Sequence, residues 1–182
     1  SAGNYTVTLT DVNNCPSVPS SFNITVHQPN QLAVTPNVIG VSCFGDDDGI
    51  IQLSVFGGTP DYTYSWAGPP GFSSTNPNVT GLQANTYFVE VSDDNGCETT
   101  PKIISIPVTG PSQSLSVSVS TTDASCFGLS DGTATANTTG GTPPFSFVWS
   151  DGQTTQTAVG LSAGSYQCVV TDANGCVSST IE

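Results

Sequence analysis

Apolar and hydroxyl-bearing residues alternate along several short segments of this chain. In residues 5–10, Tyr5, Val7 and Leu9 fall on one face of an extended strand and three threonines fall on the other. The same alternation recurs in residues 62–66, 87–91, 115–119, 145–149 and 166–170. One apolar and one polar face is typical of an antiparallel sheet with one solvated side. The pattern therefore predicts an all-β protein, in which six or seven short strands per unit pack as a β-sandwich.

The chain is a tandem repeat. Residues 42–45 (Ser-Cys-Phe-Gly) recur as residues 125–128 at an offset of 83, and Trp66 recurs as Trp149. Later matches, such as Asn-Gly-Cys at 95–97 and 174–176, have an offset of 79, because one turn is four residues shorter in the second copy. The expected domains are the C-terminal remnant of a preceding repeat (1–29), a complete repeat (30–110, "repeat A") and a second repeat truncated in its last strand (111–182, "repeat B").

Two features favour an immunoglobulin-like sandwich. A Trp occupies the central strand of each repeat, and a Tyr opens a later strand, as Tyr166 does. Cys168 follows that Tyr in the spacing of antibody domains, but its expected early-strand partner is absent. Because Cys168 aligns with Val89 and Val7, we predict a buried free thiol that serves as a small apolar residue.

The other five cysteines recur with the repeats. Each full repeat has an early and a late cysteine, and the remnant contributes one late cysteine: Cys43 and Cys97, Cys126 and Cys176, and Cys15. Counting leaves open whether disulfides form within a repeat or join neighbours as Cys15–Cys43 and Cys97–Cys126. An up-and-down sandwich would place its first and last turns at the same end, within the 7 Å or so that a disulfide spans, so the pairing within each repeat is favoured. Disulfides would place the chain in an oxidising, extracellular compartment.

The charge is strongly one-sided. The 182 residues include 14 acidic and one basic side chain, for a net charge of −13. This balance excludes nucleic-acid binding and docking to anionic lipid, because both need basic patches. It also argues against phosphoryl transfer, which needs Arg or Lys to hold the phosphate.

Many of the acidic residues lie in the turns beside the early and late cysteines: Asp46, Asp47, Asp48, Asp93, Asp94, Asp131 and Asp172. Asp-Gly and Asp-x-Asn-Gly sequences form turns through bonds between side chain and backbone, and we favour that interpretation. If a disulfide joined the two turns of a repeat, their oxygens would converge in a site that suits Ca²⁺, which is the alternative.

Catalysis finds little support in the sequence. The single histidine, His27, is absent from the other copies, and neither a Ser-His-Asp set nor a zinc site can be built around it. We therefore expect a protein that is not an enzyme and requires no cofactor, with Ca²⁺ as the one candidate metal.

The repeated motif, Cys-Phe-Gly, Asp-Gly, Gly-Gly-Thr-Pro, an aromatic run ending in Trp, Gly-Leu, Tyr and Asp-x-Asn-Gly-Cys, resembles the SprB repeat of gliding bacteria. Its hairpin after the Trp is also similar to PKD-type sandwiches. The resemblance implies a giant adhesin that is exported by type IX secretion, displayed on the outer cell surface and moved by a gliding motor. In such a protein this chain would be a stalk segment, whose partners are the rest of the adhesin and the secretion and motor components, with other regions binding a surface or glycan. The alternative is a carbohydrate- or surface-binding module, with Phe72 as the exposed contact.

Overall fold

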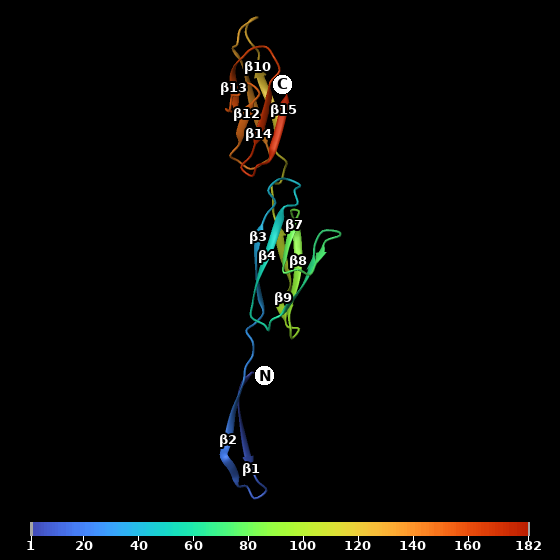
Figure 1. Cartoon of the computed structure of the whole chain (residues 1–182), viewed down its shortest axis with the longest axis vertical. Coiled ribbons are helices and arrows are strands. Elements are labelled where there is room, and N and C mark those ends of the chain that lie inside the picture. The colour runs from blue at the N-terminus through green and yellow to red at the C-terminus, as the bar shows by residue number, and fades with distance from the viewer. Residues whose placement is uncertain (1, 182) are drawn as a thin grey trace.

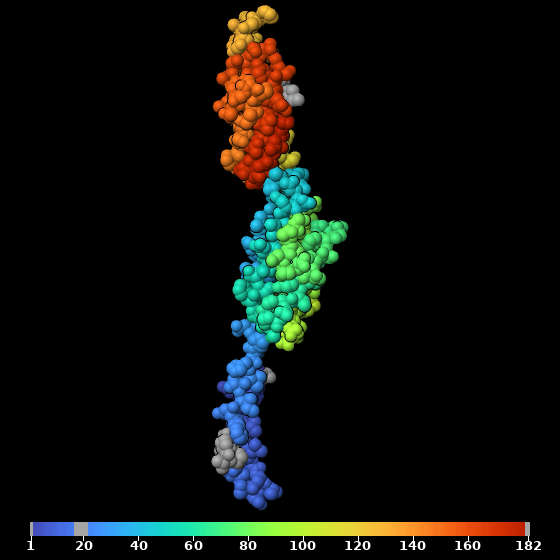
Figure 2. All heavy atoms as spheres, in the orientation of Figure 1, coloured from blue at the N-terminus to red at the C-terminus, as the bar shows by residue number. Residues whose placement is uncertain are grey.

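The computed structural model describes residues 2–181, except for the side chains of residues 17–21 and 181. The regular structure of these residues is entirely β-strand, and none of them form a helix able to cross a membrane. The units follow one another along a line: the N-terminal hairpin, repeat A and repeat B (Figures 1 and 2).

The strands form one hairpin and two larger units. The N-terminal hairpin comprises β1 (Gly3–Thr10) and β2 (Pro16–Val26). Repeat A comprises β3 (Ala33–Ile39), β4 (Gly49–Phe56), β5 (Tyr62–Ala67), β6 (Ser73–Ser74), β7 (Asn78–Leu82), β8 (Asn85–Asp93) and β9 (Glu98–Val108). Repeat B comprises β10 (Ser116–Thr122), β11 (Gly132–Thr139), β12 (Ser146–Trp149), β13 (Thr157–Leu161), β14 (Gln167–Thr171) and β15 (Val177–Ile181).

Each repeat is built from two antiparallel sheets. In repeat A the strand orders are β3-β4-β7 and β6-β5-β8-β9, and in repeat B they are β10-β11-β13 and β12-β14-β15. The register is equivalent in the two repeats, since Trp66 pairs with Val89 and Trp149 pairs with Cys168. The all-β, tandem-sandwich prediction is confirmed.

Each repeat has its own core between its sheets. The core of repeat A includes Trp66, which is 3% exposed. All the buried residues of this core lie between Leu32 and Val108 in the sequence. The core of repeat B surrounds Trp149 and consists mainly of small residues. Cys168 is a buried free thiol in that core, as predicted. The domain boundaries near residues 30 and 110 stay predictions.

The early and late cysteines of one repeat lie at opposite ends of its sandwich. In repeat A, Val41 N donates to Thr109 O (2.9 Å), which places the residues before β4 and after β9 at one end. At the other end Asp94 N donates to Thr59 O (3.1 Å), so the turn before Cys97 lies there. The expectation of a shared end was wrong because β5 and β7, although consecutive long strands, both run opposite to β4. The chain must return along the sandwich between them, and the up-and-down alternation fails.

Candidate functional site: the junction between the repeats

The junction between repeats A and B holds a disulfide that the sequence did not predict. Cys43, after β3, is bonded to Cys176, after β14, with 5.7 Å between their Cα atoms. The predicted pairings within a repeat, Cys43–Cys97 and Cys126–Cys176, are therefore wrong, and the alternative Cys15–Cys43 and Cys97–Cys126 bonds are not formed either. The reason is geometric: the early end of repeat A faces the late end of repeat B across the junction (Figure 1).

Further contacts surround the disulfide. Asn174 Nδ2 donates to the carbonyl oxygen of Ser42 (3.0 Å), and Cys176 Sγ lies 3.5 Å from the same oxygen. The linker is the second covalent connection between the repeats. It leaves repeat A beside the disulfide, because Val41 N donates a hydrogen bond to Thr109 O just before the chain enters repeat B. Two covalent connections at one junction oppose both bending and rotation of the repeats. Ser42 and Asn174 were not singled out from the sequence, although both recur next to the cysteines in each full copy.

In each early-cysteine turn (residues 42–48 in repeat A and 125–131 in repeat B), one Asp carboxylate accepts two hydrogen bonds from the Ser that precedes the cysteine. Asp48 accepts hydrogen bonds from the amide (3.0 Å) and the hydroxyl (2.6 Å) of Ser42. In repeat B, Asp131 accepts the same two bonds from Ser125 (2.9 and 2.5 Å). The Ser hydroxyl bond, followed by the Ser amide bond, lowers the pKa of both carboxyls.

The late-cysteine turn (residues 11–15, 93–97 and 172–176) is also organised by an Asp. Asp93 Oδ1 accepts from the amides of Cys97 (2.7 Å) and Asn95 (3.0 Å), and its Oδ2 accepts from Thr59 N (2.8 Å). These bonds, that of Cys97 first, lower the pKa of Asp93.

The same arrangement recurs in the other copies. Asp172 accepts from the amides of Cys176 (2.9 Å), Asn174 (2.9 Å) and Thr142 (2.8 Å). Burial raises the pKa of Asp172, but its amide hydrogen bonds together outweigh burial and the net shift is downward. Asp11 Oδ1 accepts from Cys15 N and Asn13 N (2.8 Å each).

The acidic residues of one repeat do not converge. Asp46, Asp47 and Asp48 lie at one end of repeat A, whereas Asp93 and Asp94 lie at the other, so the geometric premise of the calcium alternative is wrong. Within residues 2–181, no group of three or more His, Cys, Asp and Glu side chains is placed to hold a metal ion. The Asp side chains that are hydrogen-bonded within the turns accept from backbone N–H groups, which agrees with the turn interpretation. Calcium binding itself stays a prediction.

Phe72 is not the exposed contact that was expected. Its ring packs edge-on against Tyr87, with 4.9 Å between ring centroids, and it joins the periphery of the repeat A core. Tyr87 is 2% exposed and donates from its hydroxyl to Gln83 O (3.1 Å). The longer turn of repeat A therefore contributes an apolar side chain to packing.

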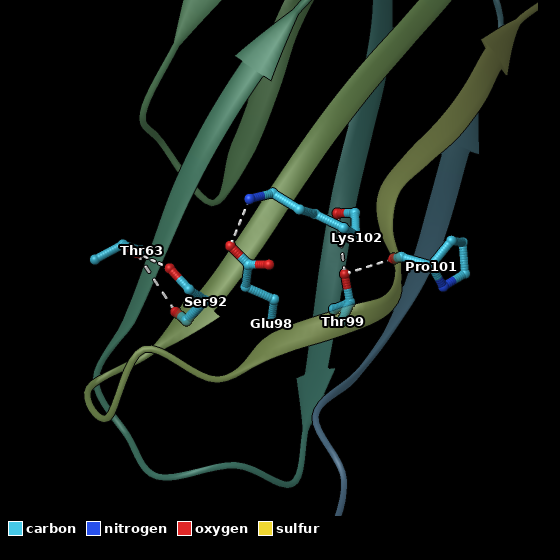
Figure 3. Close-up of polar contacts among 6 residues, drawn as sticks. All are labelled: Thr63, Ser92, Glu98, Thr99, Pro101 and Lys102. Atoms are coloured by element: carbon cyan, nitrogen blue, oxygen red, sulfur yellow. Dashed lines mark hydrogen bonds and ion pairs between the residues drawn. The ribbon is translucent and has the colours of Figure 1, made fainter.

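The single lysine of the sequence is paired. Lys102 Nζ lies 2.7 Å from Glu98 Oε1 near the start of β9, beside the Thr63–Ser92 hydroxyl pair (Figure 3). The hydrogen bond to Glu98 raises the pKa of Lys102. Both side chains are about half exposed, so solvent screens the pair and it contributes little to the stability of the fold. The surface is left with almost no basic group to offset its acidic residues.

A cavity of about 640 Å³ at the early end of repeat B is lined by residues that include Gly132, Leu161 and Tyr166. In repeat A the equivalent of Gly132 is Gly49, and Val108 of β9 packs against it. The cavity thus corresponds to a position that a strand residue fills in repeat A.

The carboxylates of the turns make the stability of the fold depend on pH. Asp48, Asp93, Asp131 and Asp172 have pKa values below the ordinary 3.8, so each favours the folded state above that value. This stability is lost as the pH falls through the folded pKa. We expect the free energy of unfolding, measured with denaturant, to fall steeply below about pH 4. Asp93→Asn should flatten this dependence, whereas Asp61→Asn, outside both turns, should leave it unchanged.

Close packing at the linker predicts a sensitive glycine. A Cβ on Gly110 would lie 2.1 Å from Val41 Cγ2, and Val41 is 5% exposed. We expect Gly110→Ala to cost about 1–3 kcal/mol through overpacking and to lower the yield of the Cys43–Cys176 bond on oxidative refolding. Val41→Ala in the same chain should restore the yield. Gly164→Ala is the matched control, because the nearest atom to its Cβ would be 3.8 Å away.

The SprB-repeat family model matches residues 35–71 and residues 118–154. The chain contains two SprB repeats. Each match runs from the first strand of a repeat through the early-cysteine turn to the turn after the Trp. The family is that of repeat regions in adhesin-like proteins, and it agrees with the resemblance noted from the motif.

Other comparisons add little. Among curated proteins, no sequence matches the chain. Among solved structures, a C-terminal 282-residue fragment of intimin, in complex with the intimin-binding domain of the translocated intimin receptor, is similar at 9% identity and a TM-score of 0.45. The match covers 86% of this chain and 64% of the intimin fragment, so the chain spans less than two thirds of that fragment. At this score the likeness carries no conclusion.

Proposed function

We propose that this chain is a non-catalytic stalk segment of a large secreted adhesin, in which bridged junctions hold consecutive SprB repeats in line. The observation that carries the proposal is the Cys43–Cys176 disulfide, because it adds a second covalent connection between two repeats that the linker already joins. A stalk needs this property, since a single flexible linker would let each repeat swivel on the next.

The surface composition supports the same role. A net charge of −13, with the single lysine paired to Glu98, makes neighbouring filaments repel one another. The packing of Phe72 against Tyr87 removes the observation that favoured a carbohydrate-binding module, so we propose no second function. Calcium has no part in the proposal.

The location and partners follow from the family resemblance. A disulfide at the junction is compatible with an oxidising, extracellular setting. We propose that the parent protein is exported by type IX secretion, stands on the outer surface of the bacterial cell and is carried by the gliding motor. The binding of a surface or glycan would belong to other regions of that protein.

Small-angle X-ray scattering tests the proposal. The oxidised chain should give one extended distribution of interatomic distances, and Cys43→Ser should give a broader one with a shorter mean. Cys126→Ser removes an exposed cysteine outside the disulfide and is the matched control. Identical curves for Cys43→Ser and the unmodified chain would contradict the stalk role of the bridge.

A further inference from the structure

Two exposed free cysteines lie at opposite ends of the pair of full repeats. Cys97 belongs to the late-cysteine turn of repeat A, and Cys126 belongs to the early-cysteine turn of repeat B. We propose that each is one half of a further junction of the Cys43–Cys176 kind, and that its partner is the complementary end of another SprB repeat. This inference is independent of the stalk proposal, since it concerns which surfaces join, whatever load the array bears.

The late half is already built around Cys97. We call the junction that the Cys43–Cys176 disulfide joins the closed junction. Asn95 Nδ2 donates to Thr59 Oγ1 (2.9 Å), and in the closed junction Asn174 Nδ2 donates to Thr142 Oγ1 (3.2 Å). The closed junction adds the bond from Asn174 to Ser42 O, the disulfide and the approach of Cys176 Sγ to Ser42 O. Thr59 N is likewise bonded to Asp93 Oδ2 as Thr142 N is to Asp172 Oδ2 (both 2.8 Å). The turn that receives a neighbour in repeat B therefore has the same conformation in repeat A without one.

The early half is built around Cys126 in the same way. Ser125 makes both of its bonds to Asp131, as Ser42 does to Asp48 in the closed junction. In repeat A the carbonyl oxygen of Ser42 accepts from Asn174 across the junction. In repeat B the two bonds to Asp131 hold the equivalent carbonyl, that of Ser125, in place. A surface preformed without its partner loses little conformational entropy on docking.

The two halves are complementary and not self-complementary. An early-cysteine turn meets a late-cysteine turn in the closed junction, so the interface is heterologous and joins repeats head to tail. The late turn supplies the donor, Asn174 Nδ2, and the early turn supplies the acceptor, Ser42 O, so two late turns would lack the acceptor and two early turns would lack the donor.

A reactive or metal-binding thiol fits Cys97 poorly. The nearby Asp93 carboxylate raises the pKa of Cys97, which is the opposite of the lowered pKa of nucleophilic cysteines. No metal-binding group of three or more His, Cys, Asp and Glu side chains occurs among the described residues. A structural disulfide uses the thiol without requiring either property.

Closure of such a junction is a two-electron oxidation. Between two copies of the chain, the Cys97 thiol of one and the Cys126 thiol of the other lose two protons and two electrons and form one sulfur–sulfur bond. A small-molecule disulfide such as oxidised glutathione is reduced to two thiols in the same reaction. The thiolate attacks, so the raised pKa of Cys97 makes closure faster at mildly alkaline pH.

The test uses a second copy of this chain as the partner. Cys15→Ser removes the competing late-turn thiol, and Cys168 is buried, so the variant exposes only Cys97 and Cys126 as free thiols. The chain is incubated in a glutathione redox buffer at mildly alkaline pH, and its cross-links are identified by non-reducing electrophoresis and peptide mapping. Random collision would make about half of the cross-links mixed, that is, Cys97–Cys126, with the rest joining two copies of the same cysteine. The proposal expects nearly all of them to be Cys97–Cys126.

Further variants decide the outcome. Asn95→Ala should return the mixed fraction toward one half, because it removes the polar contact without removing a thiol. A shortened variant that starts at residue 28 repeats the test without the N-terminal hairpin, none of whose described side chains belongs to either core. A mixed fraction near one half in both chains, or the absence of cross-links in both, would overturn the proposal.

Discussion

Stretched from its two ends, the oxidised chain should extend about 450 Å less than the same chain carrying Cys43→Ser. The disulfide joins residues 133 positions apart in the sequence, and an extended chain spans about 3.4 Å per residue. Load applied at the termini passes from Cys43 to Cys176 through the sulfur–sulfur bond. The residues between them therefore cannot contribute to the extension, even when the sandwiches unfold. Single-molecule force spectroscopy measures this difference directly.

The control for this experiment is Cys126→Ser, which should extend like the unmodified chain because Cys126 is not in the disulfide. Reduction of the unmodified chain should reproduce the longer extension of Cys43→Ser. If the oxidised chain and Cys43→Ser gave the same final length, the bridge would not carry the load.

The further junctions proposed above extend the same argument to an array. A bridge that starts at Cys126 would overlap in sequence with the bridge from Cys43 to Cys176. Consecutive bridges would then enclose the sandwich cores, and load would pass through the bonds and short segments such as residues 15–43. An array with every junction closed would be far less extensible than a string of sandwiches joined by linkers alone.

Local patterns were sufficient to predict the strands and the core. Alternation placed Trp66 and Trp149 on apolar faces, and both are buried. The alignment of Cys168 with valines predicted its burial as a free thiol, which is confirmed. These properties follow from residues close together in the sequence, so periodicity reports them.

The disulfide depends on the direction of each strand, which periodicity does not report. Tyr62–Ala67 and Asn78–Leu82 are the long strands on either side of the short β6, and both run the same way, so Cys43 and Cys97 are carried to opposite ends. The packing of Phe72 was missed for a related reason. It follows the Gly-Pro-Pro-Gly turn outside any alternating run, and its contact with Tyr87 is made only when the turn folds back onto the core.

The core of repeat B predicts that one substitution unfolds one repeat. Trp149 is 2% exposed and is the largest buried side chain of a core in which four of the other six buried residues are small: Ala134, Ala136, Ala158 and Cys168. Small core residues cannot fill the space that Trp149 would leave, and its indole N–H also donates to Thr155 O (2.9 Å). We expect Trp149→Ala to cost about 3–5 kcal/mol, a large share of the stability of a small domain.

The two tryptophans allow the repeats to be followed separately, because each repeat contains one. In Trp149→Ala the remaining fluorescence comes from Trp66, so it should report a native repeat A while circular dichroism shows the loss of the strands of repeat B. Trp149→Phe keeps most of the buried volume and should retain both repeats. Trp66→Ala should give the mirror result, with repeat A unfolded and Trp149 still buried. Loss of the Trp66 signal in Trp149→Ala would show that the bridged repeats unfold as one unit, and would contradict the independence of the two cores.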